Sequence, residues 1–386
     1  MTRTLRYLLA LTLAACGSTK VTTTATSTCS DGAQNGDETG VDCGGSCPVC
    51  AAPRGNRLLA INLYPSKDGN DTTAFAKGRS AGINSASIGW SWYPELEVAP
   101  GVFDTAILDD ANSLYAMPGF KVVVMVNPIE TDWKAVPPDL AELDFDDPVM
   151  IARFKSLLDS VFEHLSDLDI EALLIGNEAN SHLMDNPSQW SAYQGLFEAA
   201  RAHAKTLRPE IKVGVEGMFE DFFADEMQTL NAASDLIALT YYPAKPNPGH
   251  WANPDLSVIE EDMANLTRAY AEKDIYMIEH GYPTSDVLGS SEEEQEAFVR
   301  EAFRVWDLHE SRIRMVSFFM LHDFDPVWIH ELQEALGVSE HPYYEEILAA
   351  YTSIGLRTHA GQDKLAFPAL VEEAAARGWE PVSPNN

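Results

Sequence analysis

Eight short apolar runs, separated by amphipathic stretches, recur along most of this chain and limit the folds open to it. Such runs alternating with helix-like segments are typical of parallel strands covered on both faces. The runs are Leu58–Leu63, Ser85–Trp90, Lys121–Asn127, Ala172–Asn177, Ile211–Gly217, Leu236–Tyr242, Ile275–Glu279 and Met315–Leu321. Eight β-then-α repeats over more than about 250 residues predict an α/β fold, a (β/α)8 TIM barrel, at residues 57–386. A doubly wound open sheet is the alternative, but Asn62-Leu63-Tyr64-Pro65 replaces the Gly-rich turn usual after its first strand.

Two of the stretches between these runs carry helix start signals. Asp147 followed by Pro148 is a capping residue with proline in the first helical position, and apolar residues continue at helical spacing to Phe162. Ser291 with Glu294 three residues later forms a capping box ahead of a second amphipathic stretch. We therefore expect helices to start at both places, on the outside of the barrel.

The N-terminal residues 1–15 have the features of a signal peptide. Arg3 and Arg6 precede an apolar stretch that is too short to be a permanent transmembrane helix. Leu13-Ala14-Ala15-Cys16 resembles the lipobox of bacterial lipoproteins, in which the Cys becomes the acylated N-terminus. The resemblance implies export, lipidation of Cys16 and a location at the outer membrane or cell surface, with membrane contact only through this anchor. An ordinary secretory peptide is the alternative.

A small Cys-rich segment, residues 29–50, is expected to precede the barrel after a flexible, Ser- and Thr-rich tether at residues 16–28. Four closely spaced Cys residues in an exported protein predict two disulfides with three possible pairings. These residues are Cys29, Cys43, Cys47 and Cys50. Zinc is the competing interpretation, because the last two Cys have metal-ligand spacing. The segment resembles a short motif found near the termini of bacterial surface proteins.

Acidic side chains in the same segment suit tight turns and, alternatively, calcium binding. The candidates are Asp31, Asn35, Asp37, Glu38 and Asp42. The whole chain is also acidic, with 59 Asp and Glu against 26 Lys and Arg and a formal charge of −33. Phosphate backbones and anionic lipid would repel such a chain, which argues against a nucleic-acid partner.

Functional residues of a (β/α)8 barrel lie at the C-terminal ends of its strands. These ends combine aromatic rings, amides and isolated carboxylates, a set that suits a neutral, hydroxyl-rich ring such as a sugar. In chain order they supply Asn62, Tyr64, Trp90, Trp92, Tyr93, Asn127, Asp132, Trp133, Asn177, Glu178, Glu216, Tyr241, Tyr242, Glu279, His280, His322, Asp323 and Trp328.

Two of these carboxylates resemble the catalytic pair of the retaining glycoside hydrolases of the large (β/α)8 clan. Glu178, preceded by Asn177, ends the fourth predicted strand, and Glu279 ends the seventh. The sequences around Tyr241-Tyr242-Pro243 and from Glu279 to Pro283 are most similar to the endo-β-1,4-galactanases, with β-1,3-glucanase-like enzymes second. The sequence departs from the clan pattern at the end of the eighth strand, where the clan often has a Trp and this chain has Leu321-His322-Asp323. Trp328 can take the place of that Trp only if its loop folds back.

The resemblance implies hydrolysis of β-glycosidic bonds in an extracellular polysaccharide or oligosaccharide with net retention. Glu178 would be the acid/base, with a raised pKa, and Glu279 the ionised nucleophile. Tyr242 is expected to hold Glu279, and Asn177 to bind the sugar 2-hydroxyl. Further substrate contacts are expected from Trp90, Asn127, Trp133 and Trp328. The Trp residues at 90, 92 and 133 are equally compatible with plain core positions.

We expect no metal and no cofactor. Metal-dependent barrel hydrolases usually carry paired histidines on the first strand, where this chain has Asn62-Leu63-Tyr64, so His280, His322 and Asp323 are expected to form hydrogen bonds. The Glu216 side chain is expected to form a salt bridge or face solvent. We expect a monomer, and the alternative function is a catalytically inactive barrel that binds glycan or organises the cell surface.

Overall fold

The computed structural model describes residues 29–47, 50–245, 253–335 and 340–382. The signal peptide, Cys16 and the tether lie outside the described residues. The chain divides into two compact units, with the boundary in the sequence between Cys50 and Ala51. In the described part of the chain, no helix is both long and apolar enough to cross a bilayer.

The second unit is a (β/α)8 barrel, as the sequence predicts. Its strands, in order around the barrel, are β1 (Leu58–Ile61), β2 (Ser85–Ser91), β5 (Lys121–Glu130), β7 (Asp169–Asn177), β8 (Lys212–Gly214) continuing as β9 (Glu216–Met218), β10 (Ile237–Tyr241), β13 (Ile275–His280) and β14 (Ile313–Phe318). All neighbouring ladders between these strands are parallel. Each strand overlaps one of the eight apolar runs of the sequence.

Two five-stranded sheets close into this barrel at two places. At the fifth strand, β8 pairs with β7 and β9 pairs with β10, so the chain crosses from one sheet to the other at Val215. Between β1 and β2, the backbone N–H of Asn84 and the hydroxyl of Ser85 both donate to the carbonyl of Leu59, at 3.1 and 3.0 Å. These contacts join the two sheets where no strand ladder does.

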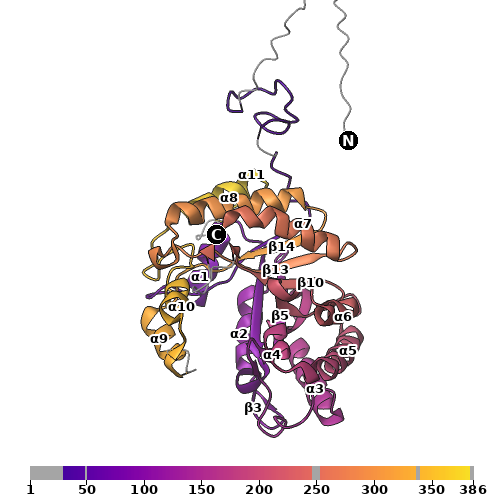
Figure 1. Ribbon diagram of the computed structural model, residues 1–386. Coiled ribbons are helices and arrows are strands. Elements are labelled where there is room, and N and C mark those ends of the chain that lie inside the picture. Colours follow the sequence, from indigo (N-terminus) through magenta and orange to yellow (C-terminus); the bar gives the residue numbers. More distant parts are fainter. Residues whose placement is uncertain (1–28, 48–49, 246–252, 336–339, 383–386) are drawn as a thin grey trace, which may run out of the picture. The chain divides into compact units, whose positions relative to one another are not determined.

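Helices cover the outside of the strands (Figure 1). Those that follow successive barrel strands are α1 (Asp71–Ser80), α2 (Ala106–Tyr115), α3 (Pro148–His164), α5 (Trp190–Leu207), α6 (Asp225–Ala233), α7 (Ile259–Ala269), α8 (Glu292–Leu308) and α11 (Ala366–Ala376). Additional helices in the connections are α4 (Ala179–Asp185), α9 (Pro326–Ala335) and α10 (Tyr344–Tyr351). Short strands complete the loops: β3 (Glu97–Ala99) with β4 (Val102–Phe103), β6 (Trp133–Lys134) with β5, and β11 (Ala244–Lys245) with β12 (Asn253–Pro254).

Both predicted helix starts are confirmed. The Asp147 side chain accepts from the backbone N–H of Val149 at 2.7 Å, with Pro148 in the first turn of α3. The Ser291 hydroxyl accepts from the backbone N–H of Glu294 at 3.3 Å, at the start of α8. These side chains satisfy donors that the first turn of a helix otherwise leaves free.

Two hydrophobic clusters divide the barrel core, and strand β5 shows how. Val123 and Met125 belong to a cluster inside the barrel, whereas Val122 and Val124 belong to the layer between strands and helices. Successive side chains of a strand point to opposite faces, so each strand supplies both clusters. The inner cluster is Leu58, Ala60, Val123, Met125, Ala172, Leu174, Leu236, Ala238, Tyr276, Ile278 and Met315.

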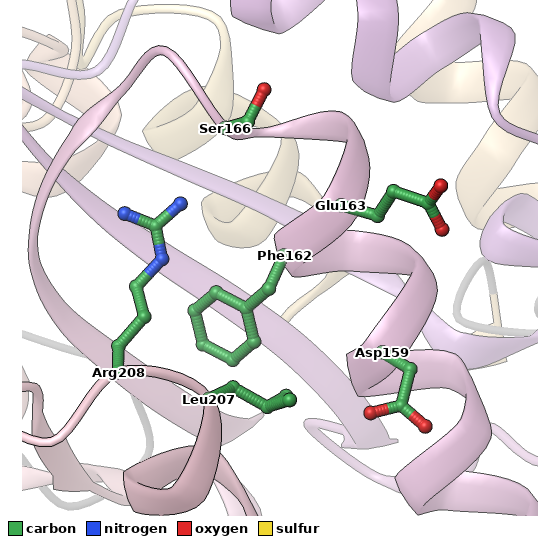
Figure 2. Close-up of a pocket in the computed structure, with 6 residues that line it drawn as sticks. All are labelled: Asp159, Phe162, Glu163, Ser166, Leu207 and Arg208. Atoms are coloured by element: carbon green, nitrogen blue, oxygen red, sulfur yellow. The ribbon is translucent and has the colours of Figure 1, made fainter.

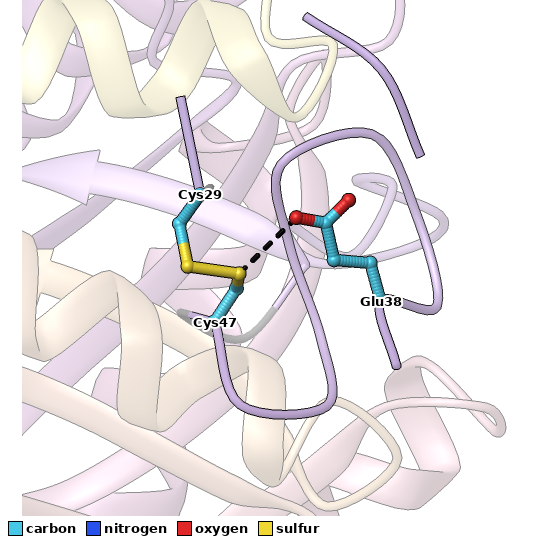
Figure 3. A group of neighbouring side chains, drawn as sticks. All are labelled: Cys29, Glu38 and Cys47. Atoms are coloured by element: carbon cyan, nitrogen blue, oxygen red, sulfur yellow. Dashed lines mark hydrogen bonds between the residues drawn. A yellow bond between two sulfur atoms is a disulfide. The ribbon is translucent and has the colours of Figure 1, made fainter. Parts of the chain in front are cut away.

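The Cys-rich segment contains two disulfides, which settles the pairing as Cys29–Cys47 and Cys43–Cys50. Among the described residues, the one converging group of three potential metal-ligating side chains is Cys29, Glu38 and Cys47 (Figure 3). Its two sulfurs are bonded to each other, so neither is a thiolate, and the zinc interpretation is wrong for this oxidised form. The 3.2 Å approach of a Glu38 oxygen to the sulfur of Cys47 is therefore not a thiol hydrogen bond.

The acidic side chains of this segment stabilise its turns. Asp42 accepts from the backbone N–H groups of Asp31 and Gly32, both at 2.8 Å. Glu38 accepts from the backbone N–H of Asn35 at 2.9 Å. These contacts favour the turn-forming interpretation over calcium binding.

A buried ion-pair network ties the start and end of the barrel unit to α8. Asp307 accepts from Arg57 at 2.8 Å and from Arg377 at 2.7 Å, and the side chains of Asp307 and Arg57 are each only 2% exposed. Removing one charge from a buried network leaves the others without compensation, which is strongly destabilising.

Asp307→Asn is therefore expected to lower the free energy of unfolding by about 3–5 kcal/mol. The matched control is Glu301→Gln, which removes one partner of a more exposed pair with Arg304 and should change stability by less than about 1 kcal/mol. Urea unfolding of both variants measures the difference. Equal stabilities of the two variants would contradict a structural role for the buried network.

Candidate active site

The two carboxylates singled out by the sequence lie at the C-terminal ends of the fourth and seventh barrel strands. Glu178 directly follows β7, and Glu279 is near the end of β13. A register shift skips one residue of β13 between Met277 and Glu279, so that Glu279 pairs with Thr240 of β10. Bulges of this kind re-aim side chains next to active sites. Thr240 itself lies two residues beyond Ala238 of the inner cluster, on the same face of its strand.

One strand end holds both carboxylates. The Thr240 hydroxyl donates to one oxygen of Glu178 at 2.7 Å, and the Tyr242 hydroxyl donates to Glu279 through a short hydrogen bond. These two donors are two residues apart at the end of β10, so they project from the same face of the sheet. Glu178 and Glu279 therefore converge at one rim of the barrel, and both are partly buried there.

The backbone around Glu178 is held in an unusual conformation. Glu178 has φ +43° and Thr131, which is β-branched, has φ +47°. Both angles fall in the left-handed region, which non-glycine residues rarely adopt. The Thr131 hydroxyl donates to the second oxygen of Glu178 at 3.0 Å, and its backbone N–H donates to the Asn177 carbonyl at 2.9 Å. Backbone strain of this kind clusters at functional sites.

A third carboxylate, Glu130, was missed by the sequence analysis. It accepts from Asn177 at 2.8 Å, and from Asn127 and Ser91 at 3.0 Å each. The third predicted strand was expected to end at Asn127, but β5 continues to Glu130 because its end pairs with β6. A carboxylate only accepts, so this network turns the Asn177 NH₂ group toward Glu130 and leaves the amide oxygen for another donor.

Burial raises the pKa of Glu178, although the hydroxyls of Thr240 and Thr131 oppose the shift. For Glu279, burial and then the charge of Glu178 raise the pKa to about 8, against the lowering effect of the Tyr242 hydroxyl. The Tyr242 hydroxyl favours the ionised form of Glu279, as expected, but burial and the charge of Glu178 outweigh it in the unliganded protein. Two interacting carboxyls titrate as a pair, and here the pair retains a proton well above the ordinary range of a Glu.

The expected surroundings of the Glu216 side chain, a salt bridge or solvent, are not found. Glu216 starts β9, is fully buried, and neither of its oxygens has a hydrogen-bond partner in the described structure. Burial, followed by the charges of Glu279, Glu178 and Glu130, raises its pKa well above the ordinary value. It neither forms a salt bridge nor faces solvent, because it points into the barrel, where the neighbouring charges are also negative.

The predicted aromatic contacts fall into two groups. Trp90 is 8% exposed and packs in the layer between strands and helices. Its neighbour Gly89 faces Met125 inside the barrel. Because side chains alternate along β2, Trp90 points toward the helices. Trp90 is therefore a core residue and not an open sugar platform. Trp133 and Trp328 are 44% and 45% exposed.

The Trp328 side chain does return toward the first strand. Its ring lies 6.3 Å from that of Tyr64 and stacks on Phe324 at 5.8 Å. A further aromatic residue that the sequence analysis did not select, Tyr351, packs against Phe324. Desolvation, the largest cause, and then the charges of Glu178 and Glu279 raise the pKa of Tyr351 to about 12.

The histidines form hydrogen bonds. The ring of His280 contacts the Tyr241 carbonyl at 3.1 Å, and the ring of His322 contacts the Tyr64 carbonyl at 2.7 Å and Arg357 at 2.7 Å. Asp323 pairs with Lys364 at 2.7 Å. Burial lowers the pKa of His280 to about 4, so it is neutral at neutral pH.

A surface hollow elsewhere on the barrel is not part of this site (Figure 2). It is lined by Asp159, Phe162, Glu163, Ser166, Leu207 and Arg208, at the C-terminal ends of α3 and α5. The strands that follow these helices start there, so the hollow is at the opposite rim from the carboxylates. The Arg208 guanidinium in this hollow already has partners. It donates to the Leu165 carbonyl at 3.1 Å and lies 5.5 Å from the Phe162 ring centre.

Comparison with known proteins finds one family whose model matches part of this chain. Residues 155–305 match the model of glycosyl hydrolase family 53, a segment that contains Glu178, Glu216 and Glu279. No curated protein sequence matches the chain.

Solved structures with the same fold include three glycoside hydrolases. One is the exo-β-1,4-mannosidase Op5Man5 from Opitutaceae bacterium strain TAV5, at 16% identity and TM-score 0.62; the match covers 83% of this chain but only 59% of that protein. Another is GH5_18 from Streptomyces cattleya in complex with GlcNAc, at 15% identity and TM-score 0.60, covering 86% and 81%. The third is a family 39 glycoside hydrolase from Bacteroides cellulosilyticus WH2, at 13% identity and TM-score 0.58, covering 85% and 66%.

The structural matches establish the fold, and one part of the chain is similar to a family of glycoside hydrolases. The carboxylate-rich rim of the barrel is where functional residues lie in this fold.

The raised pKa of Glu279 makes the stability of the fold depend on pH. A carboxyl with a folded-state pKa of about 8 instead of 4.5 stabilises the fold at acidic pH, and this contribution is lost as the pH rises through the folded value. Glu279→Gln cannot ionise, so its Tm should fall less than that of the wild type between mildly acidic and mildly alkaline pH. Differential scanning calorimetry across this range is the measurement.

Glu163→Gln, which removes an exposed carboxylate of α3, is the control and should follow the wild-type curve. Parallel Tm curves for Glu279→Gln and the wild type would contradict a raised pKa at Glu279.

Proposed function

We propose that this protein is an exported, surface-tethered glycoside hydrolase that cleaves β-glycosidic bonds of an extracellular polysaccharide with net retention. The observation that carries the proposal is the attachment of Glu178 and Glu279 to two hydroxyls of one strand end, Thr240 and Tyr242. Two carboxyls held this way can act on opposite sides of the same sugar C–O bond.

In the first step, Glu178 donates its proton to the glycosidic oxygen while Glu279 attacks the anomeric carbon. The leaving group departs as an alcohol, and a glycosyl ester forms on Glu279. In the second step, Glu178, now a carboxylate, takes a proton from water, which attacks the anomeric carbon and releases Glu279. Two inversions give net retention.

One proton on the pair is what this reaction requires at the start. Burial supports such a state because it raises the pKa of both carboxyls, and the charge of Glu178 raises the pKa of Glu279 further. A sugar ring in the site brings its own hydroxyls to the pair, and the Tyr242 hydroxyl stabilises the anionic form of Glu279.

Asn177 is assigned to the sugar 2-hydroxyl, as the resemblance implies, and its surroundings refine the role. Its NH₂ group is engaged by Glu130 at 2.8 Å and by the Thr131 hydroxyl at 3.3 Å. The amide oxygen is the atom left to face the substrate, so we propose that it accepts a hydrogen bond from the 2-hydroxyl. Trp133 and Trp328 are exposed enough to stack on sugar rings.

For the substrate, β-1,4-galactan is the first candidate, on the basis of the partial family 53 match and the residues that end the sixth and seventh strands. A panel of purified polysaccharides, with release of reducing ends as the readout, tests this choice. Binding without cleavage of any member would favour the catalytically inactive, glycan-binding alternative.

Glu178→Gln and Glu279→Gln should each lower kcat by about 10²-fold or more, because each removes a group that transfers a proton or forms a bond in the reaction. Initial rates on the panel substrate that the wild type cleaves fastest provide the test. Glu226→Gln, an exposed carboxylate of α6, serves as the control and should keep wild-type rates. Full activity in either variant at 178 or 279 would remove that residue from the mechanism.

The tether is a separate proposal with its own test. Cys16→Ser removes the expected acylation site, so the protein should move from the membrane fraction of the producing bacterium to the soluble extracellular or periplasmic fraction. Incorporation of labelled fatty acid into the wild type, and none into the variant, is the expected result. If the wild type carries no lipid, the lipoprotein interpretation is wrong and residues 1–15 are an ordinary secretory peptide.

A further inference from the structure

Glu216 lies inside the barrel, one layer beneath the carboxylate pair. Gly214, two residues earlier on the same strand, faces Leu236 of the inner cluster. Ala238, the register partner of Glu216 on β10, belongs to the same cluster. Residues two apart on a strand share a face, so Glu216 points toward the barrel axis. Thr240, which holds Glu178, is two residues beyond Ala238, so Glu216 lies below the floor of the site.

After burial, the largest effects on the pKa of Glu216 come from other carboxylates. In order of effect these are Glu279 on β13, Glu178 after β7 and Glu130 on β5. The hydroxyl that contacts Glu279 is that of Tyr242, after β10. Tyr351, on α10, is also within the field of Glu279, which adds to the effect of burial on its pKa.

Three cations near the starts of the barrel strands pair with another carboxylate. Lys121, Lys212 and Arg314 all pair with Glu171, at 3.8, 3.6 and 3.3 Å. Glu171 is near the start of β7, at the opposite end of the strand from Glu178. Glu216 therefore has no ion-pair partner among the described residues, and its burial is complete.

An ionised carboxylate in this position would be buried, without a hydrogen bond and surrounded by like charge, which is prohibitively unfavourable. A neutral carboxylic acid avoids the charge and has one O–H group to donate. An apolar surrounding can keep a carboxyl protonated at neutral pH so that it acts as a donor. The strand register points this group toward Glu279: Glu216 pairs with Ala238 on one side of β10, and Glu279 pairs with Thr240, two residues further along, on the other side.

We propose that Glu216 is a positioning residue for Glu279: a carboxylic acid that keeps its proton through the whole reaction and presents its O–H group beneath the nucleophile, favouring the anionic form of Glu279. The inference rests on the proposed function, because it takes Glu279 as the nucleophile. No proton leaves Glu216 in either step, so the reaction balances as before.

The protonation state of Glu216 can be observed without substrate. Infrared difference spectra of wild type minus Glu216→Gln, at neutral pH, should contain the C=O stretch of a protonated carboxylic acid. Glu163→Gln gives the control spectrum of an exposed carboxylate and should contain no such band. A carboxylate signature at position 216 would overturn the proposal, whatever the substrate of the enzyme.

The second measurement is the pH dependence of kcat/KM on the polysaccharide that the wild type cleaves. If Glu216 is a neutral donor, Glu216→Gln keeps the acidic limb of the profile in place, because the amide also donates. Glu216→Leu then moves this limb to higher pH by about one unit, since it removes the O–H dipole beneath the charged form of Glu279.

Two other outcomes would overturn the inference. An ionised Glu216 would raise the pKa of Glu279, so both variants would move the acidic limb to lower pH. If Glu216 has a purely structural role, Glu216→Leu would change Tm, but neither variant would move the acidic limb of the kcat/KM profile. Failure of the proposed function is distinguishable from both, because it would show as retained activity in Glu279→Gln.

Discussion

The hydroxyls of Thr240 and Tyr242 are the interaction on which the candidate site depends. They come from one strand end, they project from one face, and each donates to a different carboxylate. Residues 178 and 279 are far apart in the chain, yet the barrel places β13 next to this strand end and β7 on its other side, beyond the strand formed by β8 and β9. The same arrangement fixes the electrostatics, because two buried carboxyls held close together share protons instead of ionising independently.

Much of this fold could be predicted from the sequence because its signals are local. The eight apolar runs correspond to the eight barrel strands, and the helices after Asp147 and Ser291 start where their capping residues stand. A buried parallel strand is recognisable by its apolar run, and the barrel then dictates which strand ends share a rim. Glu178 and Glu279 could be selected for this reason.

The remaining parts depend on information that a local pattern does not carry. Glu130 was missed because the apolar run stops at Asn127, whereas β5 is prolonged to Glu130 by pairing with β6. Glu216 was expected to be solvated or paired, since a Glu usually is, and only the register with Ala238 places it inside the barrel. The disulfide pairing likewise needed the fold of the segment, because four Cys residues allow three connectivities.

The most direct test of the account is covalent trapping of the nucleophile. An activated 2-deoxy-2-fluoro glycoside of the sugar that the wild type releases should form a stable ester, because fluorine at C2 slows the second step. Peptide mass spectrometry of the trapped enzyme is predicted to find the label on Glu279, with no label in Glu279→Gln. A label on any other residue, or turnover with inversion and no trapped ester, would contradict the account.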